Sequence, residues 1–431
     1  MQERLLTSTD ETGKSSRPLA AALAGLSPVS YNRVVTLHRD AAAPPAHTGP
    51  LPWAKLRSAP AGPQAFKRMI DAVDPRAKAG DLVAVYDKQG APYGIGFYNP
   101  KSLISLRILG RETAADSEAF FAARLDQAIK LRRDLLKLDE VTDAYRLVHD
   151  YGDGMPGIVI DRYGEAFVLE FYSLGMLHQA ERIERLLKAR FPGARMVRRA
   201  SEYTQKMEGF QLKPGPEVRV RVQEHGVLFE VTPSGGYKTG FFCDQRDNRL
   251  AAAGLAAGRR VLDVCSYTGG FGIYAKTRGN AAEVTCVELD PEASEAARRN
   301  ANINQARVKT VTADAFPFLR QMGANQERFG LVILDPYKLI ASREKYAEGR
   351  QKYIDFNRLA LAIVEEGGFF VTCSCSGLVT SSDLQDFVRA AAGSAGRRVQ
   401  VLRKTGAGPD HPFAVDYPEG EYLKVLWCRV F

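Results

Sequence analysis

Acidic residues end successive strand-like segments in the second half of the chain, and this pattern constrains the fold most. The segment Val261–Phe271 starts with an apolar run that contains Asp263 and continues through a short polar turn to two glycines. It therefore predicts a strand, a loop and the start of a helix. Glu288, Asp314 and Asp335 end three further strand-like runs. Because open α/β sheets bind ligands at the carboxyl ends of parallel strands, these polar groups should converge on one crevice.

Strand-like and helix-like segments alternate from Asp244 to the carboxyl end. This alternation predicts a sheet whose first five strands are mostly parallel, with right-handed connections. The last two strands follow each other without an intervening helix, so we expect them to pair antiparallel. The glycines after Asp263 do not form a G-x-G-x-x-G motif, which argues against a nicotinamide dinucleotide site. We expect strands at residues 260–265, 283–288, 308–313, 329–335, 368–374, 397–403 and 421–429, and helices at residues 244–257, 270–277, 291–304, 315–322, 346–364 and 382–392.

The composition predicts a protein of two or three domains in a reducing compartment. With 431 residues the chain exceeds one typical domain, and no apolar run approaches the roughly 20 residues of a membrane span. The six cysteines are scattered and suggest no disulfide framework, and Cys373-x-Cys375 lacks partner ligands at zinc-site spacing. We therefore expect a cytoplasmic protein with no membrane segment and no bound metal.

The net charge of +9 is unevenly distributed, with most of the excess in residues 1–110 and in the carboxyl-terminal half. A basic N-terminal module beside a mildly basic second half fits a polyanionic partner such as nucleic acid. Solvated surface lysines explain the same total, so the charge by itself leaves both interpretations open.

Composition and periodicity divide the chain into four regions. Residues 1–50 are rich in Ala, Pro, Ser and Thr and are predicted to form a flexible extension. Short alternating strands in residues 51–112 predict a small β-barrel-like domain. Residues 113–235 combine an amphipathic helix, strands and a hairpin, which indicates a small α+β domain. Residues 236–431 hold the alternating α/β pattern.

Four motifs make the chain similar to a known enzyme family. They are GYKTGFFCDQRDNR (residues 236–249), SYTGGF (266–271), CSCSGL (373–378), and DHP (410–412) with YPEG (417–420). From roughly Pro52 to Phe431, the chain resembles the class I S-adenosylmethionine-dependent methyltransferases that carry a PUA domain and methylate C5 of cytosine in large-subunit ribosomal RNA.

This resemblance implies a fold, a cofactor and a partner. The fold is an α/β, Rossmann-like class I methyltransferase domain with a mostly parallel sheet and an antiparallel last strand. A small α+β domain and an N-terminal PUA-like β-barrel precede it. The implied cofactor is S-adenosyl-L-methionine and the implied partner is ribosomal RNA. The sequence does not fix the oligomeric state, and a homodimer is one option.

The resemblance assigns the carboxyl ends of the strands to the cofactor. Asp263 would accept a hydrogen bond from the methionine amino group, Glu288 would hold the ribose hydroxyls, and Asp314 would meet the adenine amino group. For each carboxylate a helix cap or a solvated strand end is the structural alternative. A carboxylate-lined crevice also suits the positive charge of a sulfonium. The predicted cofactor site comprises Phe242, Gln245, Asp263, Ser266, Tyr267, Thr268, Gly269, Gly270, Glu288, Leu289, Asp314, Ala315 and Asp335.

Cys375 matches the presumed nucleophile of the family. Cytosine C5 is a poor nucleophile until a thiolate adds to C6. A cysteine with an ordinary pKa of ~8.5 needs a nearby cation or donor, and Lys338 and the Ser376–Gly377 loop are the candidates. Most cysteines in strands are small buried hydrophobes, and Cys373 fits that alternative, whereas Cys375 lies where a strand gives way to a loop. Asp335 is expected to accept from the cytosine amino group.

Two positions depart from the pattern of the family. The family generally has Pro-Pro-Lys where this chain has Pro336–Lys338. The intervening Tyr337 could stack on a flipped base, worth ~1–3 kcal/mol, or could indicate methylation of a guanine or adenine nitrogen, for which Cys375 is dispensable. At the start of the PUA-like domain only Pro52–Trp53 remains of an Arg-His-Pro-Trp signature. A non-catalytic RNA-binding assembly factor is therefore a third interpretation.

Overall fold

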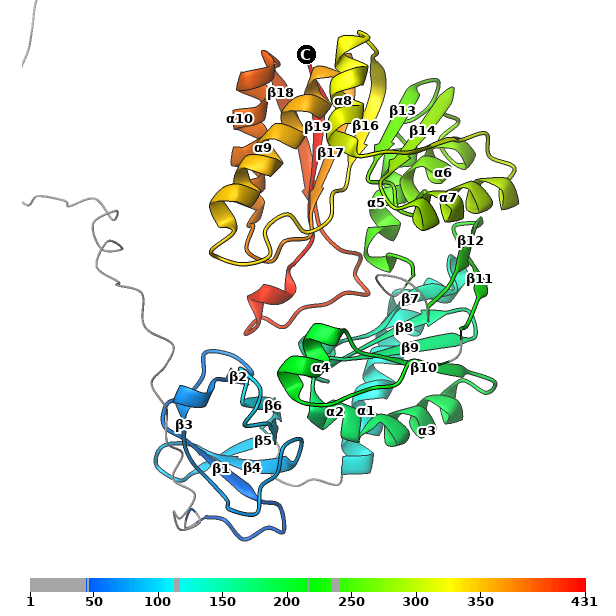
Figure 1. Cartoon of the computed structure of the whole chain (residues 1–431). Helices are drawn as coiled ribbons and strands as arrows, with labels where there is room; N and C mark the ends of the chain where they lie inside the picture. Colours follow the sequence, from blue (N-terminus) through cyan, green and yellow to red (C-terminus); the bar gives the residue numbers. More distant parts are fainter. Residues whose placement is uncertain (1–43, 45, 112–116, 216, 234–239) are drawn as a thin grey trace, which may run out of the picture. The chain divides into compact units, whose positions relative to one another are not determined.

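The computed structural model describes residues 44, 46–111, 117–215, 217–233 and 240–431 (Figure 1). Most of the expected extension at residues 1–50 lies outside the described residues, as does the first part of the motif at 236–249. The described residues form sheets of six, four, two and seven strands. Among the helices of the described part, none is long and apolar enough to cross a membrane.

The six-stranded sheet lies in the region that was expected to form a β-barrel-like domain. Its strand order is β2-β6-β5-β4-β1-β3. Strands β1 and β4 pair parallel, and the other neighbouring strands of the sheet pair antiparallel. Alternate residues such as Val83 and Val85 are buried, as expected for short half-buried strands. The strands are β1 (Trp53–Leu56), β2 (Gln64–Ala65), β3 (Ile70–Val73), β4 (Leu82–Tyr86), β5 (Pro92–Tyr98) and β6 (Leu106–Gly110).

The four-stranded sheet has the order β10-β9-β8-β7, and a hairpin of β11 and β12 follows it in the chain. Strands β7 to β9 form an antiparallel meander, whereas β10 lies parallel to β9. A parallel neighbour requires a crossover connection, which α2 and α3 supply. The elements are α1 (Ser117–Lys130), β7 (Ala144–His149), β8 (Ile158–Tyr163), β9 (Ala166–Phe171), α2 (Leu174–His178), α3 (Ala180–Arg190), β10 (Arg195–Arg199), α4 (Glu202–Glu208), β11 (Val220–Glu224) and β12 (Val227–Val231).

The seven-stranded sheet has the order β15-β14-β13-β16-β17-β19-β18. Its first five strands in sequence are parallel, and β19 pairs antiparallel with both β17 and β18. The predicted parallel sheet with an antiparallel end is therefore confirmed. Its elements are α5 (Arg246–Ala253), β13 (Arg260–Val264), α6 (Gly270–Thr277), β14 (Glu283–Glu288), α7 (Pro291–Ile303), β15 (Lys309–Thr312), α8 (Ala315–Ala324), β16 (Phe329–Leu334), α9 (Tyr346–Ala362), β17 (Val364–Ser374), α10 (Ser381–Ala395), β18 (Val399–Thr405) and β19 (Lys424–Val430).

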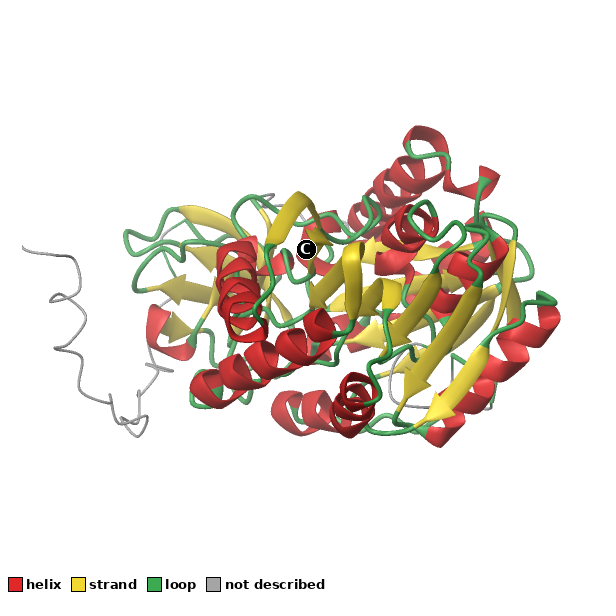
Figure 2. Cartoon of the chain, turned by 90° about the horizontal axis from the view of Figure 1, so that it is seen from above, coloured by secondary structure: helices red, strands yellow, loops and turns green. Residues whose placement is uncertain are grey.

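Helices cover both faces of this sheet (Figure 2). Apolar residues of α8, α9 and α10 pack with one set of strand residues, among them Leu262 and Val332. Residues of α5 and α6 pack with the alternate set, which includes Val261 and Leu331. All six residues of β16 are buried, as expected for a central parallel strand that is covered on both faces. This double covering leaves the carboxyl ends of the strands as the place for a ligand.

Candidate active site at the carboxyl ends of the strands

The pairing register brings four predicted site residues to one edge of the sheet. Val264, at the end of β13, pairs with Val287 of β14 and with Leu334 of β16, and Leu334 pairs in turn with Thr372 of β17. Asp263, Glu288, Asp335 and Cys375 each lie within three residues of these paired positions. Asp314 follows β15, whose Thr312 pairs with Glu288. The four acidic residues at the strand ends therefore lie along one edge of the sheet, as the sequence predicted.

The loop between β13 and α6 is held in a strained conformation around Asp263. One carboxylate oxygen of Asp263, Oδ2, accepts a hydrogen bond from the Gly272 N–H at 2.9 Å. Cys265 and Tyr267 both have left-handed backbones, with φ of 61° and 49°. Such strain costs of order 1–3 kcal/mol for each residue and concentrates at functional sites.

Two buried oxygen atoms, one near the end of β13 and one in the loop that follows it, accept no hydrogen bond from the described residues. They are Oδ1 of Asp263, a fully buried residue, and Oγ of Ser266. Burial raises the pKa of Asp263 to about 7, although the Gly272 N–H opposes the shift, and the nearby charges of Asp335 and Glu288 raise it further. Buried polar atoms are normally satisfied, so these two point to a ligand that donates hydrogen bonds.

Backbone contacts hold the rest of the loop close to α7. Thr268 is buried, and its carbonyl accepts from Nδ2 of Asn300 at 3.1 Å. Gly269 has φ of 82° and precedes the first turn of α6. A Cβ on Gly269 would lie 3.1 Å from the Cβ of Ala297, and one on Gly270 would lie 3.0 Å from Cδ of Arg249. The two glycines therefore allow a close approach of the loop, α7 and α5.

The Glu288 carboxylate organises the adjacent backbone. It accepts from the N–H groups of Tyr267 at 2.7 Å, Leu289 at 2.8 Å and Asp290 at 3.1 Å. The side chain of Leu289 is 64% exposed. A carboxylate has about four acceptor positions, so one remains on Glu288 for a ligand hydroxyl.

Asp314 caps helix α8, which was the structural alternative for this residue. Its carboxylate accepts from the Phe316 N–H at 2.8 Å, and its side chain is exposed. Ala315, the next residue, is buried in the core beside α8 and α9. The cap occupies only part of the carboxylate, so capping and contact with a ligand amino group are compatible.

The segment that begins at Phe242 lies against the ends of β13 and β16. The ring of Phe242 is 5.0 Å from the ring of Tyr267, edge to face. Gln245 donates from Nε2 to Oδ2 of Asp335 at 3.0 Å, and its own Oε1 accepts from Asn248 at 2.7 Å. The predicted cofactor residues Phe242 and Gln245 are thus joined to the β13 loop and to Asp335.

The two cysteines at the end of β17 differ as the sequence predicts. Cys373 is fully buried in an apolar cluster, and burial raises the pKa of its thiol well above the ordinary value. Cys375 follows the last residue of β17 and is only half-buried. Cys375 is therefore the more accessible of the two cysteines.

A tyrosine fixes the backbone on both sides of Cys375. Tyr353, a buried residue of α9, places its hydroxyl 2.8 Å from Oγ of Ser374 and 3.1 Å from Oγ of Ser376. Lys424 donates from Nζ to the carbonyls of Ser376 at 2.7 Å and Tyr422 at 2.8 Å. These contacts limit the positions available to the thiol.

Lys424 is a charged residue near Cys375 that the sequence analysis did not single out. It is 4% exposed, and burial lowers its pKa to about 8, whereas the thiol of Cys375 acts in the opposite direction. Lys338, which the sequence offered as the activating cation, has an exposed side chain. The sequence signal for Lys424 is a lysine that directly precedes the apolar run Val425–Cys428.

Two family models match parts of the chain. Residues 62–111 match a PUA-like domain, and residues 248–348 match a family described as conserved hypothetical protein 95. Two solved structures share the fold, each at 19% identity. One, described as a methyltransferase complexed with SAH, has a TM-score of 0.73 and covers 85% of this chain and 95% of its own. The other, described as a SAM-dependent methyltransferase from Streptococcus mutans, has a TM-score of 0.72 and covers 87% and 99%.

Curated relatives match over nearly their whole length. Ribosomal RNA large subunit methyltransferase I of Klebsiella pneumoniae is 37% identical over 379 residues, which are 85% of this chain and 94% of the relative. The Escherichia coli protein of the same name is 35% identical over 378 residues, 85% of this chain and 95% of the relative. The chain therefore belongs to the ribosomal RNA large subunit methyltransferase I family.

Proposed function

We propose that this protein uses S-adenosylmethionine to form 5-methylcytosine in large-subunit ribosomal RNA, with Cys375 as the nucleophile. The observation that supports this proposal most directly is the half-buried Cys375, which follows β17, next to Asp335, which follows the neighbouring strand β16. The contacts of Tyr353 and Lys424 with the residues around it support a defined position for this thiol.

The cofactor fits the β13 loop because the atoms without a partner there have the required chemistry. The methionine amino group is a donor, and Oδ1 of Asp263 and Oγ of Ser266 are buried acceptors. Glu288 retains acceptor capacity for a ribose hydroxyl, and Asp314 and Ala315 follow the neighbouring strand β15. When bound, S-adenosylmethionine supplies a methyl group on a positively charged sulfur.

Cys375 and Asp335 have different roles toward the cytosine: Cys375 is the nucleophile and Asp335 orients the ring. Addition of the Cys375 thiolate to C6 makes C5 electron-rich, so that C5 can accept the methyl group. A carboxylate oxygen of Asp335 accepts a hydrogen bond from the cytosine amino group and so orients the ring. The side-chain amide of Gln245 donates to Oδ2 of Asp335 and holds the carboxylate in place. After a proton acceptor removes the C5 proton, the bond between the sulfur and C6 breaks and the thiolate is regenerated. The cytosine must unstack from its neighbours in the RNA to reach the crevice, which costs a few kcal/mol.

Nucleoside analysis of ribosomal RNA tests the proposal against its alternative. The side chain of Tyr337 is 64% exposed beside Asp335, so it could also stack on a purine that is methylated on nitrogen. Large-subunit ribosomal RNA from cells that lack the protein should lose one 5-methylcytosine. Loss of a methylated guanine or adenine instead would favour the alternative, and an unchanged set of methylated nucleosides would favour a non-catalytic assembly factor.

We expect the affinity for the cofactor to depend on pH through Asp263. Its pKa of about 7 in the unliganded protein means that the carboxyl group is protonated in acid, and only the ionised form pairs fully with a cofactor amino group. The dissociation constant of S-adenosylhomocysteine should therefore rise about tenfold for each pH unit below about 7. Calorimetry between pH 5.5 and 8 measures this dependence. Asp263→Asn should bind weakly with a flatter profile, and a flat profile for the wild type would contradict the assignment.

We expect Lys424→Met to shift the pH–rate profile of methyl transfer toward higher pH. The ammonium group close to Cys375 favours the thiolate, so its removal should raise the pKa of the thiol by about one unit and lower the rate at neutral pH about tenfold. The difference from the wild type should shrink above pH 8, where Lys424 itself loses its charge. Lys424→Arg, which keeps the charge, should restore part of the rate. Equal profiles for Lys424→Met and the wild type would exclude this role.

A further inference from the structure

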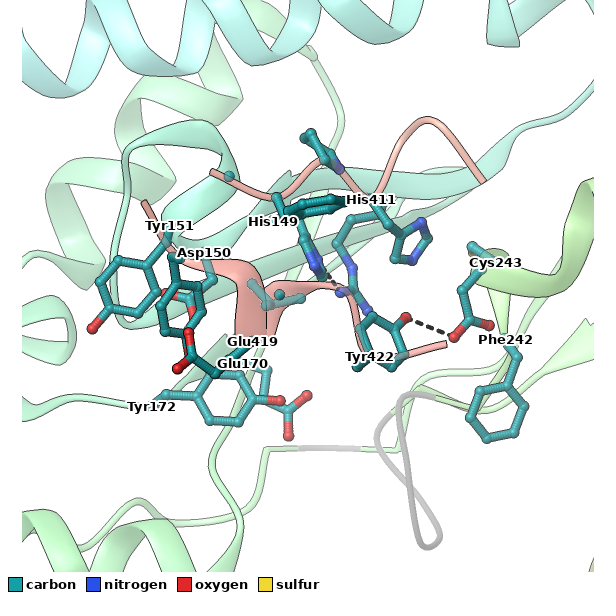
Figure 3. Close-up of a pocket in the computed structure, with 18 of the residues that line it drawn as sticks. His149, Asp150, Tyr151, Glu170, Tyr172, Phe242, Cys243, His411, Glu419 and Tyr422 are labelled. Atoms are coloured by element: carbon teal, nitrogen blue, oxygen red, sulfur yellow. Dashed lines mark hydrogen bonds between the residues drawn. The ribbon is translucent and has the colours of Figure 1, made fainter. Parts of the chain in front are cut away.

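A cavity of about 430 Å³ lies beside the candidate active site and shares Phe242 with it. Residues of β7, β8 and β9 form one wall, and the segment 411–422 with Phe242 and Asp244 forms the other (Figure 3). We call it the interdomain cavity. Neither Cys375 nor Asp335 lines it. Phe242 connects the two sites, because its ring also contacts Tyr267 of the β13 loop.

The walls of the interdomain cavity are largely aromatic. The rings of Tyr151 and Tyr417 are 4.4 Å apart. Those of His149 and Tyr422, which Figure 3 labels, are 6.0 Å apart. Tyr172 also lines the cavity and is 38% exposed, so part of its surface is open to a ligand. Unstacked bases of RNA are typically held against such aromatic faces. The volume is within the range of small-molecule sites.

Asp244 lines the cavity, and one of its carboxylate oxygens is buried and has no partner among the described residues. Asp244 is 8% exposed, and its Oδ2 accepts from the Tyr422 hydroxyl at 2.6 Å. Its other oxygen, Oδ1, accepts no hydrogen bond from the described part of the chain. Leaving such an acceptor unsatisfied costs about 1–3 kcal/mol. The geometry therefore provides for a donor from a ligand.

The charge of the cavity disfavours phosphate. Arg146 is engaged by Asp161 through Nε and Nη2, at 2.5 and 3.2 Å, and by Nδ1 of His149 at 2.7 Å. Burial, and then the charge of Arg146, hold the pKa of His149 well below its ordinary value, so its imidazole is neutral. Glu170 and Glu419 add carboxyl groups to the lining. Acceptors thus dominate, which suits the amino group of a base and not the backbone of RNA.

We propose that the interdomain cavity binds one unstacked nucleobase with an exocyclic amino group, contributed by the RNA next to the nucleotide that is methylated. The base stacks on the aromatic walls, and its amino group donates to Oδ1 of Asp244. This inference rests on the RNA substrate of the proposed function.

A second cavity shows where the adjoining nucleotides can lie. It has a volume of about 280 Å³ and shares Asp150, Tyr151, Tyr172 and Tyr417 with the interdomain cavity. It continues to Gln64 of β2 and to Tyr203 of α4, whose side chain is 71% exposed. The two cavities therefore form one route from the six-stranded sheet to the Phe242 side of the active site.

Two labelled oligonucleotides that differ in one functional group test the proposal. Oligocytidylate and oligouridylate, each about eight nucleotides long, differ at position 4 of the base, where cytosine has an amino group and uracil a carbonyl. Fluorescence anisotropy with the full chain should give about tenfold tighter binding of oligocytidylate. Asp244→Asn places an amide where Oδ1 lies and should abolish this preference. In methylation assays on ribosomal RNA it should raise KM and leave kcat within about twofold.

Matched variants separate the cavity from a general loss of structure. Asp247→Asn changes an exposed carboxylate three residues further along and should keep the preference for oligocytidylate. Tyr172→Leu removes a partly exposed ring and should weaken the binding of both oligonucleotides about tenfold. Equal binding of the two probes by the wild type, an unchanged preference in Asp244→Asn, or no binding of either probe would overturn the proposal. A protein with the expected preference that transfers no methyl group would instead contradict the proposed function and leave the cavity assignment standing.

Discussion

Cys375→Ala is expected to abolish methyl transfer to ribosomal RNA, with a loss of at least about a thousandfold in kcat. Without the thiol no covalent bond to C6 forms, and C5 is not activated. The binding of S-adenosylhomocysteine should change little, because the expected cofactor residues lie just before α5 and at or after the ends of β13, β14, β15 and β16, and none of them lies on β17. The measurement is the transfer of a labelled methyl group to RNA from cells that lack the protein.

Cys428→Ala is the matched control for this variant. Cys428 lies on β19 in the same sheet, is buried, and burial raises its pKa to about 12. Its replacement should leave the rate of methyl transfer unchanged. RNA that contains 5-fluorocytosine gives a second measurement, because fluorine at C5 cannot leave as a proton and the adduct with Cys375 should accumulate. Full activity of Cys375→Ala would show that the methyl group goes to another atom by another route.

Asp410→Ala is expected to lower the free energy of unfolding by about 3–5 kcal/mol. The Asp410 carboxylate is fully buried and accepts from Nη1 and Nη2 of Arg246, at 3.1 and 2.8 Å, and from the backbone N–H of Arg146 at 3.0 Å. Its carbonyl accepts from Arg132 at 2.7 Å. The variant leaves the Arg246 guanidinium buried without its main counter-ion, which is why the expected cost is large. Urea denaturation of the full chain measures it.

Asp247→Ala provides the control for the same arginine. Its carboxylate contacts Nε of Arg246 at 3.2 Å but is 53% exposed, so its removal should cost less than about 1 kcal/mol. Similar losses of unfolding free energy for Asp410→Ala and Asp247→Ala would show that burial of the ion pair does not determine its contribution to stability.

The contribution of Asp410 to the free energy of unfolding should also depend on pH. Burial by itself raises its pKa, but the charges of His411 and Arg246 outweigh burial and hold the pKa well below the ordinary value. The stabilisation is therefore complete above the unfolded-state pKa of about 3.9 and is lost as the pH falls below it.

Where local signals and tertiary packing agree, the sequence predicted the elements closely. Helix α6 and strand β14 have the predicted bounds. Asp290 accepts from the Glu292 N–H, and Pro291 occupies the first turn of α7, which is the standard signal for a helix start. The fold of the carboxyl-terminal region was therefore accessible from hydrophobic periodicity and caps.

Other bounds depend on contacts between distant residues. Strand β17 starts at Val364, four residues before the prediction, because Val364 pairs with Phe329 beyond an irregularity in the register. The helical segment between β9 and β10 is divided at Gln179 into α2 and α3. In the candidate site, the strand ends were predictable because parallel strands end at one edge, whereas Lys424 was not, because its importance depends on its distance from Cys375. The roles of the site residues remain predictions that the variants above test.

Asn300 of α7 and Asn304, which follows this helix, limit where the chain can be cut to make fragments for experiments. Their side-chain oxygens accept from the N–H groups of Glu230 and Leu228 on β12, at 2.8 and 2.9 Å. Asn300 also donates to Thr268 in the loop that is expected to hold the cofactor. A fragment that began after the hairpin would leave both amides facing solvent and would free one anchor of that loop. The catalytic half is thus a poor choice for isolated expression, and fragments for crystallography or NMR should retain the hairpin.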